Sequence, residues 1–437
     1  DETIEAVSAL FAEKGSNAWF EMDAADILPK GFACPHCGKS AGFTKEEDTL
    51  DGWFDSGSTH FAAMKKDQGF WPATMYLEGL DQYRGWFQSS LLTAVGAFGE
   101  GAPFKECVTH GWTVDGEGRA MHKSLGNGVD PADIFNENGA DILRLWAASA
   151  DYHADVRCSK AIFQQLSQNY LKFRNTCKFM LDNLVDFDPA HLTKAEDMPV
   201  LDRWLITKLN ELIEKVEQSY NDYEFHIITH AVNDFCVTTL SSFYLDIVKD
   251  RLYCEAADSA ERRSAQTALY LTLSTLAKLF APILAFTCDE IWLAMPHTAE
   301  DDARNVVLND MNKPFTAYAL DAETMARWEH IIEVRTAVNG ALEEARAAKV
   351  IGKSLEADVH LTVPEGDVFL ADENPAALAD LFIVSKVELT VGGELAVKVE
   401  NAAGTKCPRC WKHSLTPNAE GLCPRCAEVV RHLPDLL

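Results

Sequence analysis

The sequence is poor in basic residues. It has 39 Lys and Arg against 67 Asp and Glu, a formal net charge of −28 over 437 residues. Because affinity for phosphates comes from Lys and Arg, this balance argues weakly against nucleic acid as a partner. A local basic face is enough for binding, however, and residues 401–437 carry five Lys or Arg against three Asp or Glu. The tail is therefore slightly positive on an acidic body.

These 437 residues show no signal-peptide pattern, no internal repeat and no long uncharged apolar run. The opening residues lack the basic segment and apolar core of a signal peptide. The most apolar stretch, 269–295, contains Lys278, Asp289 and Glu290, so we expect two buried helices there and not a membrane span. We expect a soluble, cytoplasmic protein without a membrane partner. Because the first residue is Asp1, we expect the chain to start inside a larger protein.

The cysteines do not have the pattern of a disulfide scaffold. Six of the twelve form three Cys-x-x-Cys pairs, and the others are scattered. Without a secretory segment, paired cysteines indicate metal. Cys407 and Cys410 are followed, after twelve residues, by Cys423 and Cys426. Two such knuckles complete a tetrahedron of thiolates, which predicts a structural Zn²⁺ site. Four free cysteines or two disulfides are the alternatives.

Basic residues surround this predicted zinc site. We expect them to offset the negative charge of four thiolates around Zn²⁺; they are Lys406, Arg409, Lys412 and Arg425. The tail is too short to hold a core without metal. Trp411 is expected either to contact RNA or to pack, and both readings stay open. The third pair, Cys34 and Cys37, is half a knuckle with no second pair nearby, so its metal binding is also open.

The hydrophobic pattern changes along the chain. Residues 50–150 alternate short apolar runs with Gly-containing turns and helical stretches, which indicates an α/β layer. From 151 to 293 the pattern is helical, and two stripes predict the core of a bundle: Leu201, Leu205, Leu209, Leu212 and Val216, then Leu269, Leu273, Leu276 and Phe280. A polar connector covers 294–325. We then predict a helix over 329–349 and strands over 358–363, 387–391 and 395–399.

Two segments between residues 76 and 127 have the residue types of a ligand site. In the first, Glu78, Gly79, Asp81 and Gln82 follow an apolar strand end. Ligands of open α/β sheets bind at that edge, where carboxylates and an amide suit ribose hydroxyls and an ammonium group. The second is a Gly-rich loop with Arg119, His122 and Lys123, and a mobile lysine there can close over phosphates. A polar loop and a solvated hairpin are the alternatives.

These segments resemble the class I aminoacyl-tRNA synthetases, and among them the bacterial isoleucyl-tRNA synthetases. Met121-His-Lys-Ser-Leu-Gly-Asn127 is similar to the family's KMSKS loop. The run Glu-Gly-Leu-Asp-Gln-Tyr-Arg-Gly-Trp-Phe at 78–87 is similar to the isoleucyl form of the adenylate-binding strand, and Trp-Phe-Asp-Ser-Gly-Ser at 53–58 also matches. The resemblance continues through 201–204, 241–246 and 351–356 to the Cys-Pro-Arg-Cys-Trp tail, nearly the whole chain.

The resemblance implies a fold and a division into domains. The expected fold is a partial Rossmann-like α/β catalytic domain, then an all-α anticodon-binding bundle, a small α+β junction and a zinc module. The expected ranges are 1–49 for the end of an inserted region with the Cys34/Cys37 knuckle, 50–150 for the second part of the catalytic domain, 151–194 for connecting helices, 195–328 for the anticodon-binding domain, 329–400 for the junction and 401–437 for the zinc module.

The resemblance also implies an activity, isoleucine–tRNA ligase, and roles for matching residues. Isoleucine and ATP would form isoleucyl-adenylate, with Mg²⁺ expected, and the aminoacyl group would pass to tRNA(Ile). Glu78, Gly79, Asp81 and Gln82 would contact the adenylate, and Trp53 and Trp86 would wall the isoleucine pocket. Met121, His122, Lys123 and Ser124 would form the ATP phosphate loop, with Lys123 as the catalytic residue. A monomer is expected.

The chain departs from the family pattern in two ways. Ala120 and His122 stand where the KMSKS pattern has Lys and Ser, so one loop lysine is absent; compensation by Arg119 or a protonated His122 is a hypothesis. No His-Ile-Gly-His motif and no editing insertion occur, so we expect this chain alone neither to activate isoleucine efficiently nor to edit. A non-catalytic tRNA-binding module is the alternative function. A synthetase for another branched amino acid is disfavoured by the Asp-Gln-x-Arg-Gly-Trp run.

Overall fold

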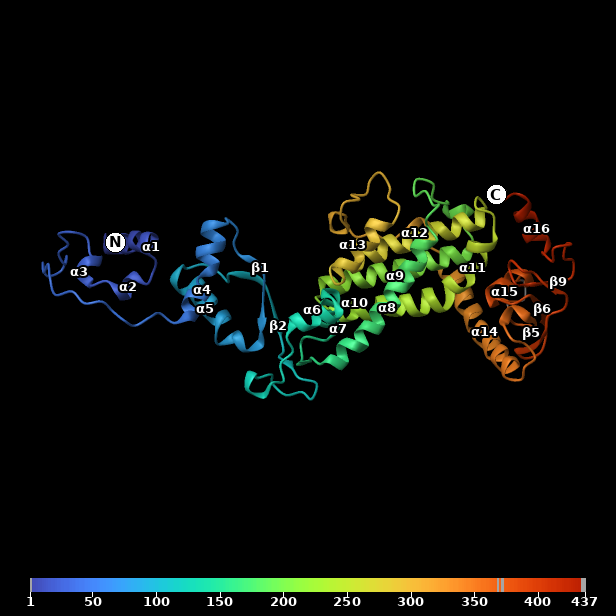
Figure 1. Ribbon diagram of the computed structural model, residues 1–437, viewed down its shortest axis with the longest axis horizontal. Helices are drawn as coiled ribbons and strands as arrows, with labels where there is room; N and C mark the ends of the chain where they lie inside the picture. Colours follow the sequence, from blue (N-terminus) through green and yellow to red (C-terminus); the bar gives the residue numbers. More distant parts are fainter. Residues whose placement is uncertain (1, 368, 371–372, 434–437) are drawn as a thin grey trace. The chain divides into compact units, whose positions relative to one another are not determined.

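The computed structural model describes residues 2–367, 369–370 and 373–433. The chain divides into two compact units, Asp1–His110 and Gly111–Leu437, and their elements can be followed by label in Figure 1. Among the described helices, none combines the length and the apolar composition that a membrane span requires.

The first unit opens with three short helices and continues with a small α/β layer. The opening helices are α1 (Glu2–Lys14), α2 (Ala18–Glu21) and α3 (Ala24–Ile27). The layer has two parallel strands, β1 (Ala73–Gly79) and β2 (Phe104–His110). Its helices are α4 (Gly52–Gly57), the π-helical η1 (His60–Asp67), the 3₁₀ turn η2 (Leu80–Tyr83), α5 (Trp86–Leu92) and the π-helical η3 (Thr93–Ala97). The α/β layer expected in this region is therefore present.

The second unit begins with a strand pair and helices that dock on the bundle. β3 (Thr113–Val114) pairs in parallel with β4 (Val156–Arg157), and between them lie η4 (Lys123–Leu125), α6 (Pro131–Asn138) and α7 (Ala140–Ser149). The buried Asp141 of α7 accepts hydrogen bonds from Thr287 N at 2.8 Å and Thr287 Oγ1 at 2.6 Å. The Asp141 carboxylate thus binds the first turn of a helix that comes later in the chain, and this contact fixes α7 to the bundle.

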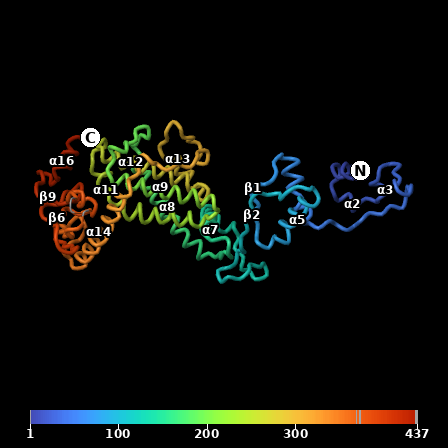
Figure 2. The backbone as a smooth tube through the Cα atoms, turned by 180° about the vertical axis from the view of Figure 1, so that it is seen from behind, coloured from blue at the N-terminus to red at the C-terminus, as the bar shows by residue number. Residues whose placement is uncertain are grey.

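The bundle contains most of the hydrophobic core. Its elements are α8 (Lys160–Asp182), η5 (Ala195–Asp197), α9 (Val200–Asn221), α10 (Phe225–Asp234), the π-helical η6 (Phe235–Tyr244), α11 (Leu245–Cys254), α12 (Ala260–Phe280) and α13 (Ala285–Ala294). Figures 1 and 2 both show α8, α9 and α12 side by side. All nine residues of the two predicted stripes are buried in one core, so the bundle prediction is confirmed, including the buried helices expected within 269–295.

One buried carboxylate explains two of the motifs shared with the family. Asp202 in α9 accepts hydrogen bonds from Tyr244 Oη at 2.8 Å, Ser264 Oγ at 2.5 Å and Arg251 Nη1 at 3.2 Å. A buried charge is tolerated only when it is paired and hydrogen-bonded, and these contacts join α9 to η6, α11 and α12 at one point. The runs at 201–204 and 241–246 are therefore structural here.

A small α+β part follows the bundle. The connector holds the 3₁₀ turns η7 (Val306–Leu308) and η8 (Thr316–Tyr318), and α14 (Ala322–Ala347) leads through η9 (Ser354–Glu356) to a three-stranded sheet. In this sheet β5 (Ala357–Val363) lies between a parallel β6 (Lys386–Val391) and an antiparallel β7 (Ala396–Asn401), with α15 (Pro375–Phe382) between β5 and β6. The tail adds β8 (Thr405–Lys406), β9 (His413–Ser414) and α16 (Pro424–Arg431).

Local capping moves one predicted boundary. The helix predicted over 329–349 begins seven residues earlier, at Ala322, because Asp321 accepts a hydrogen bond from Thr324 N at 2.8 Å and caps the helix. The three strands predicted after it are each within two residues of β5, β6 and β7. Periodicity placed the apolar residues, but the start of α14 depends on a capping residue that has no apolar signal.

Candidate functional site

The first candidate site lies at the carboxyl end of β1. Glu78 and Gly79 are the last two residues of the strand, so the prediction that they follow it is wrong by two residues. Asp81 and Gln82 lie on the turn η2, where Gln82 Nε2 donates to Asp81 Oδ2 at 3.2 Å. The carboxylates of Glu78 and Asp81 are exposed. Sequence-distant β2 pairs alongside, with Glu78 opposite Thr109.

The glycines of this site lie close to polar side chains. A Cβ on Gly79 would lie 2.7 Å from Asp81 Oδ1, and one on Gly85 would lie 2.6 Å from Gln82 Oε1. A larger residue at either position would therefore displace the end of the Asp81 or Gln82 side chain. The turn between β1 and α5 is therefore tightly wound, and it brings Asp81 and Gln82 next to the strand end.

Trp53 and Trp86 are brought to the same turn. The Trp53 ring lies against Gly85, where an added Cβ would be 3.2 Å from its Cζ2 atom. Trp86 stacks on the buried Tyr76 at 4.2 Å between ring centroids, and its Nε1 donates to Ser56 O at 3.1 Å. Gln82 Oε1 accepts a hydrogen bond from Trp86 N at 3.2 Å. The two tryptophans and Gln82 thus share one local framework, with Trp53 still 46% exposed.

The second candidate site is the loop 115–127 in the other unit. Asp115 Oδ1 accepts from Glu117 N at 3.0 Å and Arg119 N at 2.9 Å, and Oδ2 accepts from Arg119 Nε and Asn127 Nδ2, both at 2.9 Å. The hydrogen bond from Asn127, with those from Arg119, holds the pKa of Asp115 well below its usual range. Met121 is half-buried, and His122, Lys123 and Ser124 are exposed.

The geometry of Arg119 speaks against one hypothesis for the missing loop lysine. Its guanidinium lies between two carboxylates, with Nε 2.9 Å from Asp115 Oδ2 and Nη2 3.0 Å from Glu117 Oε2. Because both partners neutralise its charge, Arg119 is poorly suited to replace a lysine that binds phosphate. His122 remains as the second candidate. Sequence reasoning singled out neither Asp115 nor Asn127 as a site residue.

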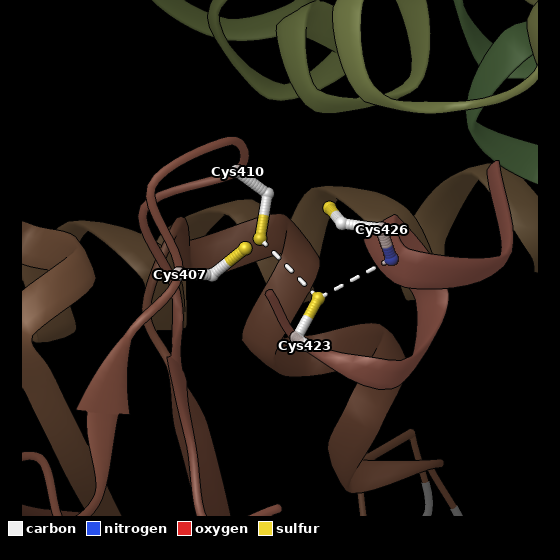
Figure 3. A group of neighbouring side chains, drawn as sticks. All are labelled: Cys407, Cys410, Cys423 and Cys426. Atoms are coloured by element: carbon white, nitrogen blue, oxygen red, sulfur yellow. Dashed lines mark hydrogen bonds between the residues drawn. The ribbon is translucent and has the colours of Figure 1, made fainter. Parts of the chain in front are cut away.

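The four tail cysteines converge on one point, as Figure 3 shows. Their sulfur atoms all lie within 4.8 Å of one another, and Cys410 Sγ is 3.7 Å from Cys423 Sγ. A disulfide needs about 2.05 Å, whereas thiolates about 2.3 Å from a tetrahedral Zn²⁺ stand about 3.8 Å apart. Burial acts to raise the pKa of Cys407, but backbone N–H groups of Cys410, Cys423 and Arg409 bring it to about 6, whereas burial raises the pKa of Cys410 and Cys426. The support for the site is therefore the sulfur geometry. The residues fit the predicted zinc site.

The basic residues of the tail mostly face carboxylates and not sulfur. Arg425 contacts Asp250 Oδ2 at 2.5 Å and Glu255 Oε1 at 2.8 Å, Lys406 contacts Glu356 at 3.3 Å, and Lys412 contacts Asp380. Of these four basic side chains, only that of Arg409 donates to a tail sulfur among the described hydrogen bonds, to Cys426 Sγ at 3.7 Å. Three of the four thus form ion pairs with carboxylates next to or within α11, η9 and α15, and the offset of the thiolate charge by all four stays a prediction.

Arg409 joins the knuckle to a helix end. Its guanidinium donates to Cys254 O and, at 3.3 Å, to Tyr253 O. These are carbonyls of the last turn of α11, which have no partner within the helix and favour a cation. The arginine of each Cys-Pro-Arg-Cys knuckle therefore holds the tail against α11. The Trp411 side chain is 53% exposed, with Lys353 Nζ 5.2 Å from its ring centroid.

The Cys34/Cys37 pair forms the turn of a knuckle without further ligands in the described residues. Cys34 N donates to Lys39 O, and Gly38 N donates to Cys34 O, both at 2.8 Å. Backbone N–H groups of His36 and Cys37 lower the pKa of Cys34. Across residues 2–367, 369–370 and 373–433, the tail is the single group of three or more clustered His, Cys, Asp or Glu ligands.

Family models match both parts of the chain. Residues 1–159 match the model of class I tRNA synthetases (I, L, M and V), and residues 202–361 match the anticodon-binding domain of tRNA ligases. In structure, the chain is similar to LeuRS of Agrobacterium radiobacter K84, solved as a complex with tRNA and LeuAMS. The TM-score is 0.53 at 16% identity, with 85% of this chain and 38% of that chain covered. At that identity the likeness concerns the fold alone.

Curated relatives are similar over nearly the whole chain. The isoleucine–tRNA ligase of Moorella thermoacetica is 47% identical over 99% of this chain, and that of Carboxydothermus hydrogenoformans is 48% identical over 100% of it. The chain spans about half the length of these relatives, 48% of each. With its partial catalytic domain, helical anticodon-binding domain and four-cysteine cluster, the chain belongs to the class I tRNA synthetases, in their isoleucine–tRNA ligase branch.

Proposed function

We propose that this chain works as part of an isoleucine–tRNA ligase. The reaction joins isoleucine and ATP to isoleucyl-adenylate and pyrophosphate, and then transfers the isoleucyl group to the terminal ribose of tRNA(Ile). The similarity over 99% of the chain to isoleucine–tRNA ligases carries this proposal. ATP would enter with Mg²⁺, and we propose a cytoplasmic location, where these substrates are found.

Residues at the end of β1 would bind the aminoacyl-adenylate. The exposed carboxylates of Glu78 and Asp81 suit ribose hydroxyls and the ammonium group of isoleucine. Gln82, whose side chain is held by Trp86 N and Asp81, adds an amide in a fixed orientation. The aromatic rings of Trp53 and Trp86 would wall the isoleucine side chain. The contribution of this unit is positioning, which can supply a large part of a barrier reduction.

Lys123 would stabilise charge on the phosphates. The side chain is exposed on the turn η4, and the described residues give it no ion-pair partner. Removing one group that stabilises transition-state charge costs about 10²–10³ in rate in known enzymes. Met121 would fix the loop through its half-buried side chain, and His122 and Ser124 would contact the phosphates. The four-cysteine site would hold Zn²⁺ in a structural role, because it leaves no open position for substrate.

The direct test is a chimaera in which this chain replaces the matching part of the Moorella thermoacetica ligase. We expect isoleucine-dependent exchange of pyrophosphate into ATP and charging of tRNA(Ile). Lys123→Ala should reduce the exchange about 10²-fold or more. Lys172→Ala is the matched control, because this exposed lysine lies on α8, and it should have no effect.

The alternative, a non-catalytic tRNA-binding module, is favoured by the neutralised Arg119 beside Ala120. A folded chimaera that binds tRNA(Ile) but exchanges no pyrophosphate would contradict the ligase and support this module. If Ala120→Lys then restored exchange, the loop departure itself would be the cause.

A further inference from the structure

We propose that Asp115 and Asn127 are positioning residues that hold the base of the loop 119–127 in one shape, so that Lys123 reaches the phosphates of ATP on a preformed turn. The inference rests on the ligase function proposed above and adds two residues to it. Neither residue needs to touch a substrate; both would act through Lys123.

The two side chains bind the loop at both of its ends. Asp115 accepts four hydrogen bonds, one from Glu117 N, two from Arg119 and one from Asn127 Nδ2. Asn127 Nδ2 also donates to Ala120 O at 3.1 Å, and its Oδ1 accepts from His122 N at 2.9 Å. The amide of Asn127 thus uses both its donor and its acceptor side on backbone or carboxylate. We call this set, Asp115, Arg119 and Asn127 with the backbone of Ala120 and His122, the loop base.

The loop base is attached firmly to the second unit. Val114 forms a bridge with Ala120, and Val114 itself belongs to β3, which pairs with β4. A Cβ on Gly111 would lie 2.4 Å from Ala154 O, and one on Gly116 would lie 3.2 Å from Ser159 Cβ at the start of α8. Strand pairing and these close approaches leave the base little freedom to shift.

The tip of the loop is a single turn without such ties. Lys123–Leu125 form a 3₁₀ turn that ends at Gly126, whose φ of 62° is left-handed. Leu125 N donates to His122 O at 3.0 Å. The turn therefore begins directly after His122, whose backbone N–H donates to Asn127 Oδ1. Among the described hydrogen bonds, none involves the side chains of Lys123 or Ser124. The loop therefore combines a fixed base with an exposed lysine on a short turn.

The composition of this loop makes the placement of Lys123 important. Arg119 is neutralised within the base by Asp115 and Glu117, and position 120 is alanine. Lys123 is thus the one lysine of the segment 115–127. A misplacement of about 1 Å can cost a factor of about 10² in rate. A loop with a single lysine has no second one to compensate for a distorted base.

The experiment measures pyrophosphate exchange in the chimaera described above. Asn127→Ala should lower kcat roughly tenfold to a hundredfold, with the KM for isoleucine unchanged because that site lies on other residues. In a Lys123→Ala background, Asn127→Ala should have no further effect, since it acts through the lysine. Asn305→Ala is the control: Asn305 also accepts a backbone hydrogen bond, from Val307 N at 3.0 Å, and its loss should leave exchange unchanged.

A reciprocal exchange tests the contact itself. Asn127→Asp places two carboxylates where Nδ2 and Oδ2 are now 2.9 Å apart and should lower kcat more than Asn127→Ala. Adding Asp115→Asn restores a donor and acceptor pair and should recover part of the loss. Three results would each overturn the inference. The effects of Asn127→Ala and Lys123→Ala could prove independent and multiply, Asn127→Ala could leave kcat unchanged, or Asn305→Ala could cause an equal loss. An inactive unaltered chimaera would overturn the proposed ligase function, and this inference with it.

Discussion

The two units of this chain differ in how they keep their apolar side chains from water. In the described part of Asp1–His110, five hydrophobic residues are buried: Ala18, Ile27, Ala73, Tyr76 and Ala94. In Gly111–Leu437 the main core runs from Leu145 to Val387, and two smaller clusters are separate from it. Among the described residues, thirteen of the thirty exposed large hydrophobic ones precede Gly111, although that unit has only 110 residues.

The difference follows from architecture. The helices of the bundle pack around one another, so that each buries an apolar stripe. A parallel sheet normally has both faces covered. The sheet of the first unit has two strands, β1 and β2, and the short helices beside it cannot bury much apolar area. Ion pairs show the same contrast, because among the described ones the first unit has a single pair, Lys65 with Glu100. The second unit should therefore be stable by itself, and the first unit should unfold more easily.

The zinc tail gives the strongest test of this difference in stability between the two units. It belongs to the stable unit, yet four of its buried residues form a small separate cluster with Cys254 of α11: Cys407, Cys410, Leu422 and Cys426. Removing Zn²⁺ with a chelator, or Cys407→Ser, should forfeit about 10 kcal/mol or more of metal-coupled folding in the tail. Metal analysis should find one Zn²⁺ per chain, and proteolysis should cut the metal-free tail first while α9 and α12 stay protected.

Cys37→Ser is the matched control, because it removes one cysteine of the isolated pair and should leave the zinc content unchanged. In the chimaera, Cys407→Ser should lower tRNA charging more than adenylate formation, since the tail contacts α11 of the anticodon-binding bundle. Equal losses in both steps would mean that the tail supports the whole fold. A content of two Zn²⁺ would show that Cys34 and Cys37 bind metal with other ligands.

The same substitution in both units sharpens the comparison directly. Leu209 is fully buried in α9 and Leu92 is 61% exposed at the end of α5. Leu209→Ala should lower the free energy of unfolding by about 2–5 kcal/mol through lost burial and a cavity, whereas Leu92→Ala should change it by less than about 0.5 kcal/mol. Urea unfolding of the chain, followed by circular dichroism, measures both. A large loss for Leu92→Ala would show that this face is covered in solution.

Sequence patterns predicted the helical core and the residues at the strand end, but they did not predict the loop base. The nine stripe residues were predicted because a helix repeats its apolar positions every three or four residues, and this pattern is local. Glu78, Asp81 and Gln82 were placed near one strand end because they come next to a short apolar run, which is also a local pattern. The loop base was not found, because its hydrogen bonds join Asp115 to Asn127 across twelve residues and depend on the shape of the turn between them.

The tail shows the same limit over a longer separation. The four sulfur atoms could be grouped from Cys-x-x-Cys spacing alone, since each knuckle is local. The partners of Arg425 are Asp250 and Glu255, which lie some 170 residues earlier. No pattern near Arg425 indicates them, so its charge was assigned to the nearest anions, the thiolates. Spacing predicts local chemistry, and packing decides which distant charges meet.

Trp411 tests whether an exposed aromatic residue of the stable unit has a function. Packing and RNA contact were both open, and its 53% exposure with Lys353 over the ring favours contact. Trp411→Ala should weaken binding of tRNA(Ile) by about 1–3 kcal/mol, the usual loss for a stacked base, with little change in unfolding free energy. Filter binding at constant salt measures this. The control is Leu415→Ala, a tail residue 75% exposed; unchanged affinity with lost stability would mean that Trp411 packs.

The smallest expected effect concerns an ion pair within the second unit, between Arg262 and Asp186. The Arg262 guanidinium donates to Asp186 at 2.6 and 2.9 Å, and with Gln266 it lowers the pKa of Asp186 to about 2. A carboxylate with a lowered pKa in the folded state stabilises above its unfolded value, near 4, and this is lost as pH falls toward 2. Because the side chain is 43% exposed, solvent screening limits the contribution to about 1 kcal/mol.

Asp186→Asn should therefore lower the free energy of unfolding by about 1 kcal/mol at pH 7, and the difference from the unaltered chain should shrink between pH 4 and pH 2. Urea unfolding at several pH values measures it. Asp310→Asn is the control, because Asp310 is exposed, and no hydrogen bond to its side chain occurs among the described ones. A difference that persisted at pH 2 would mean that Asp186 acts through hydrogen-bond geometry and not through its charge. The contrast between the units would then rest on apolar burial alone.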